Sequence, residues 1–225
     1  MKIEGNPKRV IAIGDIHGCA AALSALIEAI LPVKDDLVIP LGDLVDRGPS
    51  SSTVIQMLLE IGQECQLRPI LGNHEEMMLQ AMNDPKMLEM WLRCGGASTL
   101  ESYGFSGDLA VVEPSHLDFL SAFSDYLEVE DFFFVHANYD PGLPFAEQPA
   151  DLLRWTSLDQ ELPSAHTSGK HAIVGHTPER SGEIFSLPHL TCIDTYCYGG
   201  GWLTAMEVLS GQIWQASAEG SLREI

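Results

Sequence analysis

The feature that most constrains the fold of this chain is a unit that occurs three times in its first 82 residues. Each unit is a short apolar run, a polar loop and a segment with the spacing of an amphipathic helix. Repeated strand, loop and helix units predict an α/β core, in which ligands bind where the strands end in loops. The apolar runs are residues 10–13, 37–41 and 67–71, and the helical segments are residues 22–30, 51–61 and 76–82.

Further elements surround this core. Residues 83–126 have mostly helical spacing, broken at Pro85 and Gly95-Gly96, and predict a helical insert that covers one side of the core. We therefore expect a single domain over residues 1–225, with the insert at about 83–126. Two more strands each lead into a histidine, a long loop contains a short helix, and three closing strands follow. These segments are residues 132–135, 172–174, 149–153, 190–193, 203–208 and 213–216.

Composition limits the surroundings and partners of the chain. Hydrophobic residues make up 45%, without an uncharged apolar tract of membrane-spanning length, and residues 1–9 lack the apolar region of a signal peptide. We expect a cytoplasmic protein without a membrane partner. The net charge of −20 would repel a polyanion and argues against a nucleic-acid partner. The five cysteines never form a CxxC pair, which predicts reduced thiols. The sequence does not specify an oligomeric state.

Polar residues that can bind metal stand just behind five separate strands. A single histidine there is usually a core or capping residue, and the Asp, Gly and Pro of residues 41–49 also suit a simple turn. Five coincidences favour chemistry. Carboxylate, imidazole and carboxamide ligands without cysteine indicate Mn, Fe, Zn or Mg, and two ions fit better than one because a carboxylate can bridge them. The residues are Asp15, His17, Asp43, Asp46, Arg47, Asn73, His74, His136 and His176.

Five motifs resemble, in order and spacing, those of the calcineurin-like metallophosphoesterases, and more narrowly the phosphoprotein phosphatase branch. They are GDIHG (14–18), GDLVDRG (42–48), GNHE (72–75), HA (136–137) and GHTP (175–178). The match spans residues 10–178 and continues weakly at 193–197, which is similar to a substrate-side loop of that branch. The resemblance implies an α/β/β/α sandwich with two mixed β-sheets.

The resemblance also implies a metal centre of two divalent ions, manganese first, with Fe, Zn or Mg as alternatives. Asp15, His17 and Asp43 would hold one ion. Asp43, Asn73, His136 and His176 would hold the other, with Asp43 as the bridge. The ions would make the pocket locally positive, so that it attracts a phosphate dianion despite the acidity of the chain.

The remaining motif residues are assigned to catalysis and substrate binding. His74 would protonate the leaving oxygen, and Asp46 would orient the His74 ring. The phosphoryl group would be bound by Arg47, Asn73 and Arg154. Each assignment has a structural alternative: an Asp46–Arg47 salt bridge, a helix-capping His74 and a surface or stacking role for Arg154. In this chain Arg154 precedes Trp155, a departure from the family order that places its role in question. His166 and Lys170 could approach the pocket or could be plain loop residues.

We expect a dinuclear-metal-dependent phosphomonoesterase, a hydrolase of phosphoproteins at Ser or Thr with Tyr as a further target, in which a metal-bridging hydroxide attacks phosphorus directly. The alternative enzyme is a diadenosine tetraphosphate hydrolase or another nucleotide phosphohydrolase. The insert offers only Lys86 and Arg93 as bases for a nucleotide, which favours the phosphatase and a phosphoprotein or small phosphate-ester substrate. An alternative of another class is a catalytically silent metal-binding regulatory protein.

Overall fold

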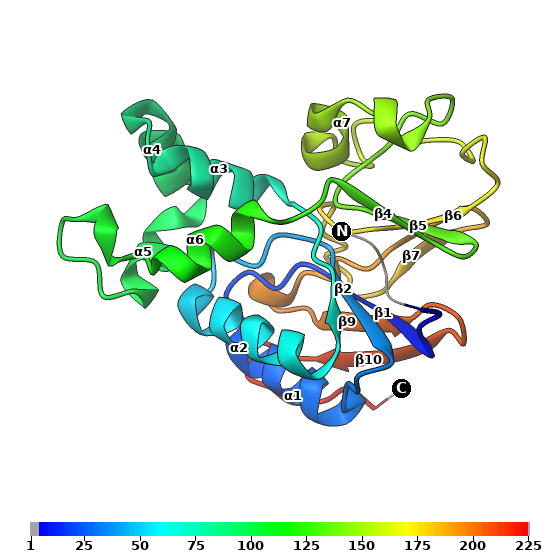
Figure 1. The fold of residues 1–225 in the computed structure, drawn as a ribbon, viewed down its shortest axis with the longest axis horizontal. Helices are drawn as coiled ribbons and strands as arrows, with labels where there is room; N and C mark the ends of the chain where they lie inside the picture. The colour runs from blue at the N-terminus through cyan, green and yellow to red at the C-terminus, as the bar shows by residue number, and fades with distance from the viewer. Residues whose placement is uncertain (1–4, 225) are drawn as a thin grey trace.

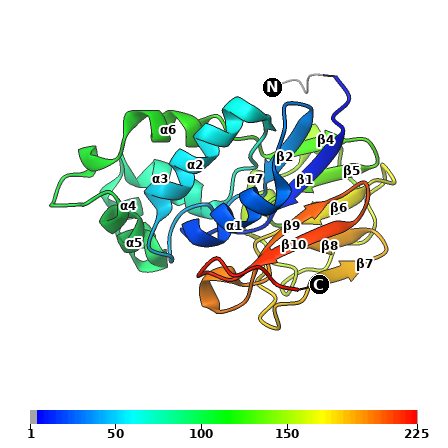
Figure 2. The ribbon, with the colours of Figure 1, turned by 90° about the horizontal axis from the view of Figure 1, so that it is seen from below.

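The computed structural model describes residues 5–224 and contains two five-stranded sheets (Figures 1 and 2). In the first sheet, of order β10-β9-β1-β2-β3, the three strands of the βα units are parallel, β9 is antiparallel to β1, and β10 is antiparallel to β9. Its strands are β1 (Arg9–Ile13), β2 (Asp36–Pro40), β3 (Gln66–Leu67), β9 (Leu203–Glu207) and β10 (Gln212–Ala216).

The second sheet has the order β4-β5-β6-β8-β7, with β5, β6 and β8 parallel and an antiparallel strand at each edge. Both sheets are therefore mixed. The strands are β4 (Tyr126–Val129), β5 (Phe132–Val135), β6 (His171–Val174), β7 (Phe185–Leu187) and β8 (Leu190–Cys192).

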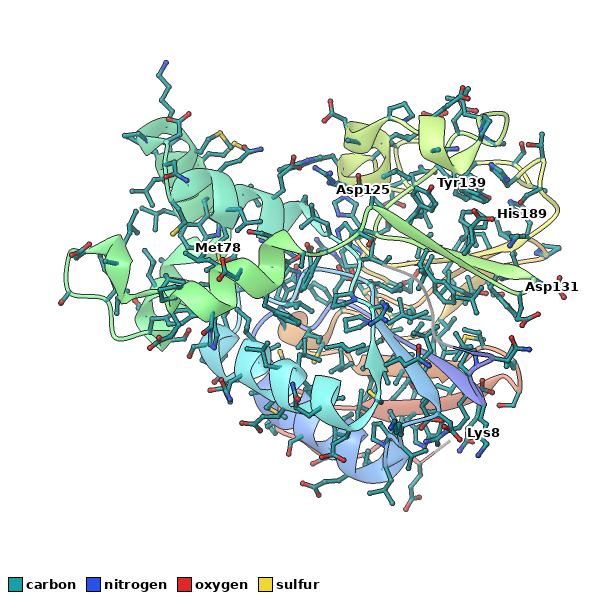
Figure 3. The ribbon with its side chains drawn as sticks, in the orientation of Figure 1. Lys8, Met78, Asp125, Asp131, Tyr139 and His189 are labelled. Atoms are coloured by element: carbon teal, nitrogen blue, oxygen red, sulfur yellow. The ribbon has the colours of Figure 1, made fainter. Side chains whose placement is uncertain are left out.

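The layers follow from the alternation of side chains along the strands. In β1, Ile11 and Ile13 pack against α1 (Ala20–Ile30) and α2 (Ser51–Glu64), whereas Val10 and Ala12 face the second sheet. The buried side chains of the two sheets meet in a common core (Figure 3). The outer face of the second sheet is covered by a 3-10 turn (Phe145–Glu147) and α7 (Ala150–Trp155). The predicted α/β/β/α sandwich with two mixed sheets is confirmed.

The predicted insert consists of short helices that extend to one side of the sheets in Figure 1. Buried Trp91, Leu100 and Leu120 belong to the same apolar cluster as α1 and α2. The insert therefore packs on the helical layer of the first sheet. After α3 (Asn73–Ala81), its elements are α4 (Pro85–Trp91), a π-helical turn (Leu92–Gly96), α5 (Ala97–Ser102), a 3-10 turn (Leu109–Val111) and α6 (Pro114–Ser121).

Several boundaries differ from the sequence expectation. Strand β3 ends at Leu67 rather than at residue 71, although the N–H groups of Arg68 and Ile70 still donate to the Val38 and Pro40 carbonyls of β2. Helix α3 begins at Asn73, three residues before the predicted start, so Asn73 and His74 lie in its first turn. Strands β4 and β7 were not predicted. Within residues 5–224, no helix has the length and apolar character needed to span a bilayer.

Candidate active site

The loops that carry the predicted site residues meet at one edge of the sheets and are joined by backbone hydrogen bonds. The His17 N–H donates to the Asp43 carbonyl at 2.8 Å, and the Gly175 N–H donates to the His136 carbonyl at 2.8 Å. These bonds connect the loop after β1 to the loop after β2, and the loop after β5 to the loop after β6. The four strand ends therefore hold their polar side chains in a fixed relation.

Backbone strain is concentrated in these loops. Five residues with side chains adopt the left-handed region that normally favours glycine: φ is 45° at His17, 48° at Asp43, 72° at Asp46, 68° at Arg47 and 63° at His176. Each such residue costs roughly 1–3 kcal/mol. The packing of the loops holds these five residues in the left-handed conformation. Such strain is typical of functional sites, where the direction of a side chain has to be fixed.

Glycine supports the same packing at two positions. A Cβ on Gly72 would lie 2.4 Å from Asp43 Oδ1, and a Cβ on Gly175 would lie 2.2 Å from Asp15 Oδ1. Any side chain at either position would displace a predicted metal ligand. Two of the motif glycines are thus explained by close approach to carboxylates.

Backbone carbonyls orient three imidazoles, one from the group that contains His17 and two from the group that contains His136 and His176. His17 Nδ1 donates to the Val45 carbonyl at 2.8 Å, His136 Nδ1 to the Leu41 carbonyl at 2.7 Å, and His176 Nε2 to the Trp155 carbonyl at 3.0 Å. The opposite nitrogen of each ring therefore carries a lone pair. Such a backbone partner on the far nitrogen is the usual outer support of a metal-binding histidine.

The lone pairs of His136 and His176 converge with the Asn73 amide oxygen, and no hydrogen lies between the three atoms. His136 Nε2 lies 3.0 Å from Asn73 Oδ1 and 3.1 Å from His176 Nδ1, and the last two atoms are 3.1 Å apart. With both ring protons on the far nitrogens, all three atoms present only lone pairs. They would repel one another unless a cation lay among them, so the donor set fits a metal ion.

Asp43 lies between two groups of donors. His17 Nε2 is 3.5 Å from Asp43 Oδ2, and His136 Nε2 is 3.4 Å from Asp43 Oδ1. Two sets of candidate ligand atoms, each mutually within 4.8 Å, share this carboxylate: His17, Asp43 and His74, and Asp43, His136 and His176. The position suits the predicted bridge. Asp15 accepts the His176 backbone N–H, at 3.1 Å to Oδ1 and 3.0 Å to Oδ2.

Burial keeps these histidines in the form that binds metal. It lowers the pKa of His17 to about 3 and the pKa of His176 to about 4, so both rings are neutral near pH 7. A neutral imidazole offers its lone pair, whereas an imidazolium would repel a cation.

His74 and Asp46 form a buried pair beside this centre. His74 Nδ1 donates to Asp46 Oδ2 at 2.6 Å, and His74 Nε2 is 3.9 Å from Asp43 Oδ2. Burial lowers the pKa of His74, but the Asp43 and Asp46 carboxylates outweigh it and the net pKa is raised. The pair thus has the geometry of a general acid with its orienting carboxylate.

The insert holds Asp46 in place, which sequence reasoning missed. Trp91 Nε1 lies 2.9 and 2.8 Å from the two Asp46 carboxylate oxygens, and Thr99 Oγ1 donates to Asp46 Oδ1 at 2.7 Å. The sequence analysis had found no chemistry in residues 83–126. The Gly95-Gly96 pair was the available signal, because Gly95 lies against Arg47 and Gly96 against the Trp91 ring.

Arg47 lies over the His74 pair. Its Nη2 donates to His74 Nε2 at 3.1 Å, its Nη1 donates to Tyr198 Oη at 2.5 Å, and its guanidinium carbon is 4.5 Å from the centre of the Tyr198 ring. Tyr198 lies in a 3-10 turn (Cys197–Gly199). Arg47 forms no ion pair with Asp46, so the salt bridge considered from the sequence is absent from these described loops. The guanidinium is exposed and can reach a phosphoryl group.

Glu75 links the loop after β2 to the start of α3 through hydrogen bonds of its side chain. Its Oε2 accepts the N–H groups of Asp43 at 2.8 Å and Gly72 at 3.2 Å, and its Oε1 accepts those of Leu44 at 2.7 Å and Val45 at 3.3 Å. This buried carboxylate therefore fixes the backbone that presents Asp43 and starts α3. The sequence analysis quoted Glu75 within a motif but assigned it no role.

Arg154 is placed differently from its predicted role. Its donors are taken by two carboxylates: Nε is 2.9 Å from Asp125 Oδ1, and Nη1 is 2.7 Å from Glu76 Oε1. The side chain is only 16% exposed, so it is not a free surface residue. An arginine held by two acids is not poised for phosphate, and this arrangement favours a structural role. The neighbouring Trp155 supplies the carbonyl that orients His176.

His166 and Lys170 also have partners away from the centre. His166 stacks on Phe145 with ring centres 4.4 Å apart and bonds to the Leu143 carbonyl at 2.9 Å. Lys170 pairs with Glu128 at 3.2 Å. Both act as loop residues in this structure.

The sandwich fold and the histidine, carboxylate and amide cluster at its strand ends define a metallophosphoesterase. The model of the calcineurin-like phosphoesterase family matches residues 8–199, and the chain belongs to that family. It is 28% identical to serine/threonine-protein phosphatase 1 of Salmonella typhimurium, with 90% of this chain and 93% of that protein aligned.

Relatives named for nucleotide substrates are similar too. The chain is 26% identical to a symmetrical bis(5'-nucleosyl)-tetraphosphatase of Legionella pneumophila, over 94% of this chain and 98% of that protein. Among solved structures, a putative diadenosine tetraphosphatase superposes with a TM-score of 0.71 at 22% identity, covering 93% of this chain and 95% of the other. The likeness to that structure supports the fold alone.

Proposed function

We propose that this protein is a metal-dependent phosphomonoesterase that hydrolyses phosphoserine and phosphothreonine in proteins. The observation that carries the proposal is the His74–Asp46 pair, 2.6 Å between Nδ1 and Oδ2, placed beside two groups of metal donors that share Asp43. A poor alkoxide leaving group needs a general acid, and this pair provides one at the edge of the centre.

The protein's own residues account for substrate positioning and proton transfer. Two divalent ions, held by Asp15, His17, Asp43, Asn73, His136 and His176, would activate water and offset the charge of the phosphoryl oxygens. The Arg47 guanidinium would donate two hydrogen bonds to oxygens of the phosphoryl group. Once the Arg47 guanidinium has moved away from His74 Nε2, this nitrogen can carry a proton and donate it to the oxygen of the leaving group. Asp46 keeps the ring oriented and stays ionised while His74 gives up its Nε2 proton.

The choice of substrate rests on the insert and on the relatives. The insert has only two basic residues, Lys86 and Arg93, and Arg93 is paired with Glu89. This leaves little positive charge in the insert for binding a polyphosphate. The relative named as a serine/threonine phosphatase aligns over almost its whole length. The second candidate, a dinucleoside polyphosphate hydrolase, is favoured by the full-length Legionella relative.

A side-by-side rate measurement tests the proposal. The manganese-loaded protein is assayed with phosphoserine, phosphothreonine and phosphotyrosine peptides, free nucleotides, diadenosine tetraphosphate and para-nitrophenyl phosphate. We expect the largest kcat/KM on phosphoserine or phosphothreonine peptides. Rates dominated by the dinucleotide would overturn the substrate class, and no turnover of para-nitrophenyl phosphate would indicate a regulatory metal-binding protein instead.

A further inference from the structure

Two arginines stack on tyrosines of the same loop. The Arg47 guanidinium lies 4.5 Å from the Tyr198 ring, and the Arg180 guanidinium lies 5.4 Å from the Tyr196 ring. The two tyrosine rings contact each other edge to face at 4.9 Å. A continuous row of contacts thus leads from the predicted phosphate-binding Arg47 to Arg180.

Arg180 differs from most other arginines of this acidic chain. Four arginines form ion pairs with carboxylates, whereas no carboxylate of residues 5–224 lies within 4.0 Å of the exposed Arg180 guanidinium. Arg180 thus has no carboxylate partner in the described residues, although the chain has 32 acidic residues. The four paired residues are Arg9, Arg93, Arg154 and Arg223.

The backbone fixes Arg180 and Tyr196 relative to the active site. Arg180 follows the metal-donor residue His176 by four positions, and the N–H of Glu179 donates to the Asp194 carbonyl at 2.9 Å. The Asp194 carboxylate in turn accepts the Tyr196 N–H at 3.1 Å, which holds Tyr196 in the left-handed region at φ 63°. A strained tyrosine is therefore held against an unpaired arginine.

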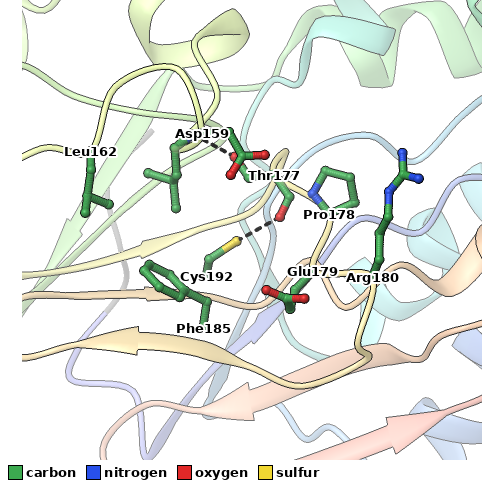
Figure 4. Close-up of a pocket in the computed structure, with 9 residues that line it drawn as sticks. Asp159, Leu162, Thr177, Pro178, Glu179, Arg180, Phe185 and Cys192 are labelled. Carbon is green, nitrogen blue, oxygen red and sulfur yellow. Dashed lines mark hydrogen bonds between the residues drawn. The ribbon is translucent and has the colours of Figure 1, made fainter.

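Arg180 lines a cavity with two acidic residues but forms no ion pair with either of them. A cavity of about 450 Å³ is lined by Arg180 together with Thr177, Pro178, Glu179 and Asp159. Figure 4 shows the Arg180 side chain extending away from the Glu179 carboxylate. The guanidinium thus extends away from the Glu179 carboxylate and lies over the Tyr196 ring.

We propose that Arg180, stacked on Tyr196, is a second anion subsite that binds a further negative group of the substrate while Arg47 binds the reacting phosphoryl group. The inference rests on the proposed function. A guanidinium on an aromatic face is weakly hydrated and forks to a carboxylate or phosphate. A peptide spans about 3.5 Å a residue, so an acid two to four residues from the phosphoserine could reach it. The inner phosphates of a dinucleoside polyphosphate offer the same chemistry.

The test compares Arg180→Gln with the wild type, both loaded with manganese. Substrates are a phosphoserine peptide with neutral flanks, its twin with two aspartates near the phosphoserine, diadenosine tetraphosphate, and para-nitrophenyl phosphate as a substrate without a second anion. We expect the wild type to prefer the acidic twin or the dinucleotide, and Arg180→Gln to lose about five- to tenfold in kcat/KM on the preferred one. Turnover of para-nitrophenyl phosphate and of the neutral peptide should stay within about twofold.

Two controls make the outcome decisive. Arg223→Gln removes another stacked arginine, 5.3 Å from the Trp202 ring, and should leave the preference unchanged. Calorimetric affinities for peptides with a phosphonate in place of the phosphate measure the same preference without turnover. Equal loss on all substrates, an equal effect of Arg223→Gln, or a wild type without preference would overturn the subsite. Failure to hydrolyse para-nitrophenyl phosphate would instead contradict the proposed function, and the phosphonate affinities would still decide the subsite.

Discussion

The indole nitrogen of Trp91 lies 2.9 and 2.8 Å from the two carboxylate oxygens of Asp46, so a helix of the insert reaches the catalytic loop. Asp46 is buried and receives a second hydrogen bond from Thr99. The insert therefore helps to position the Asp46 carboxylate, beyond covering the core. It fixes the carboxylate that orients His74.

Removal of the indole N–H tests this relationship. Trp91→Phe keeps an aromatic ring but leaves Asp46 with one donor fewer, so the His74 ring loses its fixed orientation. We expect kcat on an alkyl phosphate to fall about ten- to a hundredfold. Trp214→Phe, on β10 and away from Asp46, is the matched control and should keep wild-type kcat. Wild-type kcat in both variants would show that the contact is irrelevant to the reaction.

The general-acid role of His74 is tested through the leaving group. His74→Asn should lower turnover of a phosphoserine peptide by about 10²–10⁴-fold, because an alkoxide needs a proton as it departs. Turnover of para-nitrophenyl phosphate should fall far less, because its phenolate leaves without help. The measurement is the ratio of the two rates in the variant and the wild type. Equal losses on both substrates would contradict the role.

The same residue predicts a pH dependence. Burial lowers the pKa of His74, but Asp43 and Asp46 raise it above 6.5 in net. The proton donor is therefore present at low pH and is lost as pH rises through the raised pKa, so kcat/KM on an alkyl phosphate should fall there. By linkage, the stabilisation from this shift is complete below about pH 6.5 and disappears over the same rise. In His74→Asn, the fall of kcat/KM at high pH should be absent. If the same fall persists in this variant, the titrating group is another residue.

Glu75 predicts a stability effect. Glutamine at this position would turn an NH₂ group toward two of the four backbone N–H groups that now donate to the carboxylate. We expect Glu75→Gln to lower the free energy of unfolding of the metal-free protein by roughly 2–4 kcal/mol in urea denaturation. Glu89→Gln, at an exposed ion pair, should change it by less than about 0.5 kcal/mol. Similar small changes in both variants would refute the bracing role.

The sequence predicted the parts of the fold that depend on local pattern. The strand ends that deliver Asp15, Asp43, His136 and His176 were found because an apolar run followed by polar residues is a local signal. The short edge strands β4 and β7 were missed, since tertiary pairing defines them. The contacts of Trp91 with Asp46 and of Arg154 with Glu76 and Asp125 join residues far apart in the chain, and spacing alone does not reveal such pairs.

The most direct test of the central claim is the metal content of the protein measured together with its turnover of para-nitrophenyl phosphate. The wild type, stripped with a chelator and titrated with manganese, should regain activity as it binds two ions per chain. Asp43→Asn, which alters the carboxylate shared by both donor groups, should bind fewer ions and lose activity by several orders of magnitude. Full turnover in the stripped wild type, or wild-type turnover in Asp43→Asn, would contradict the account.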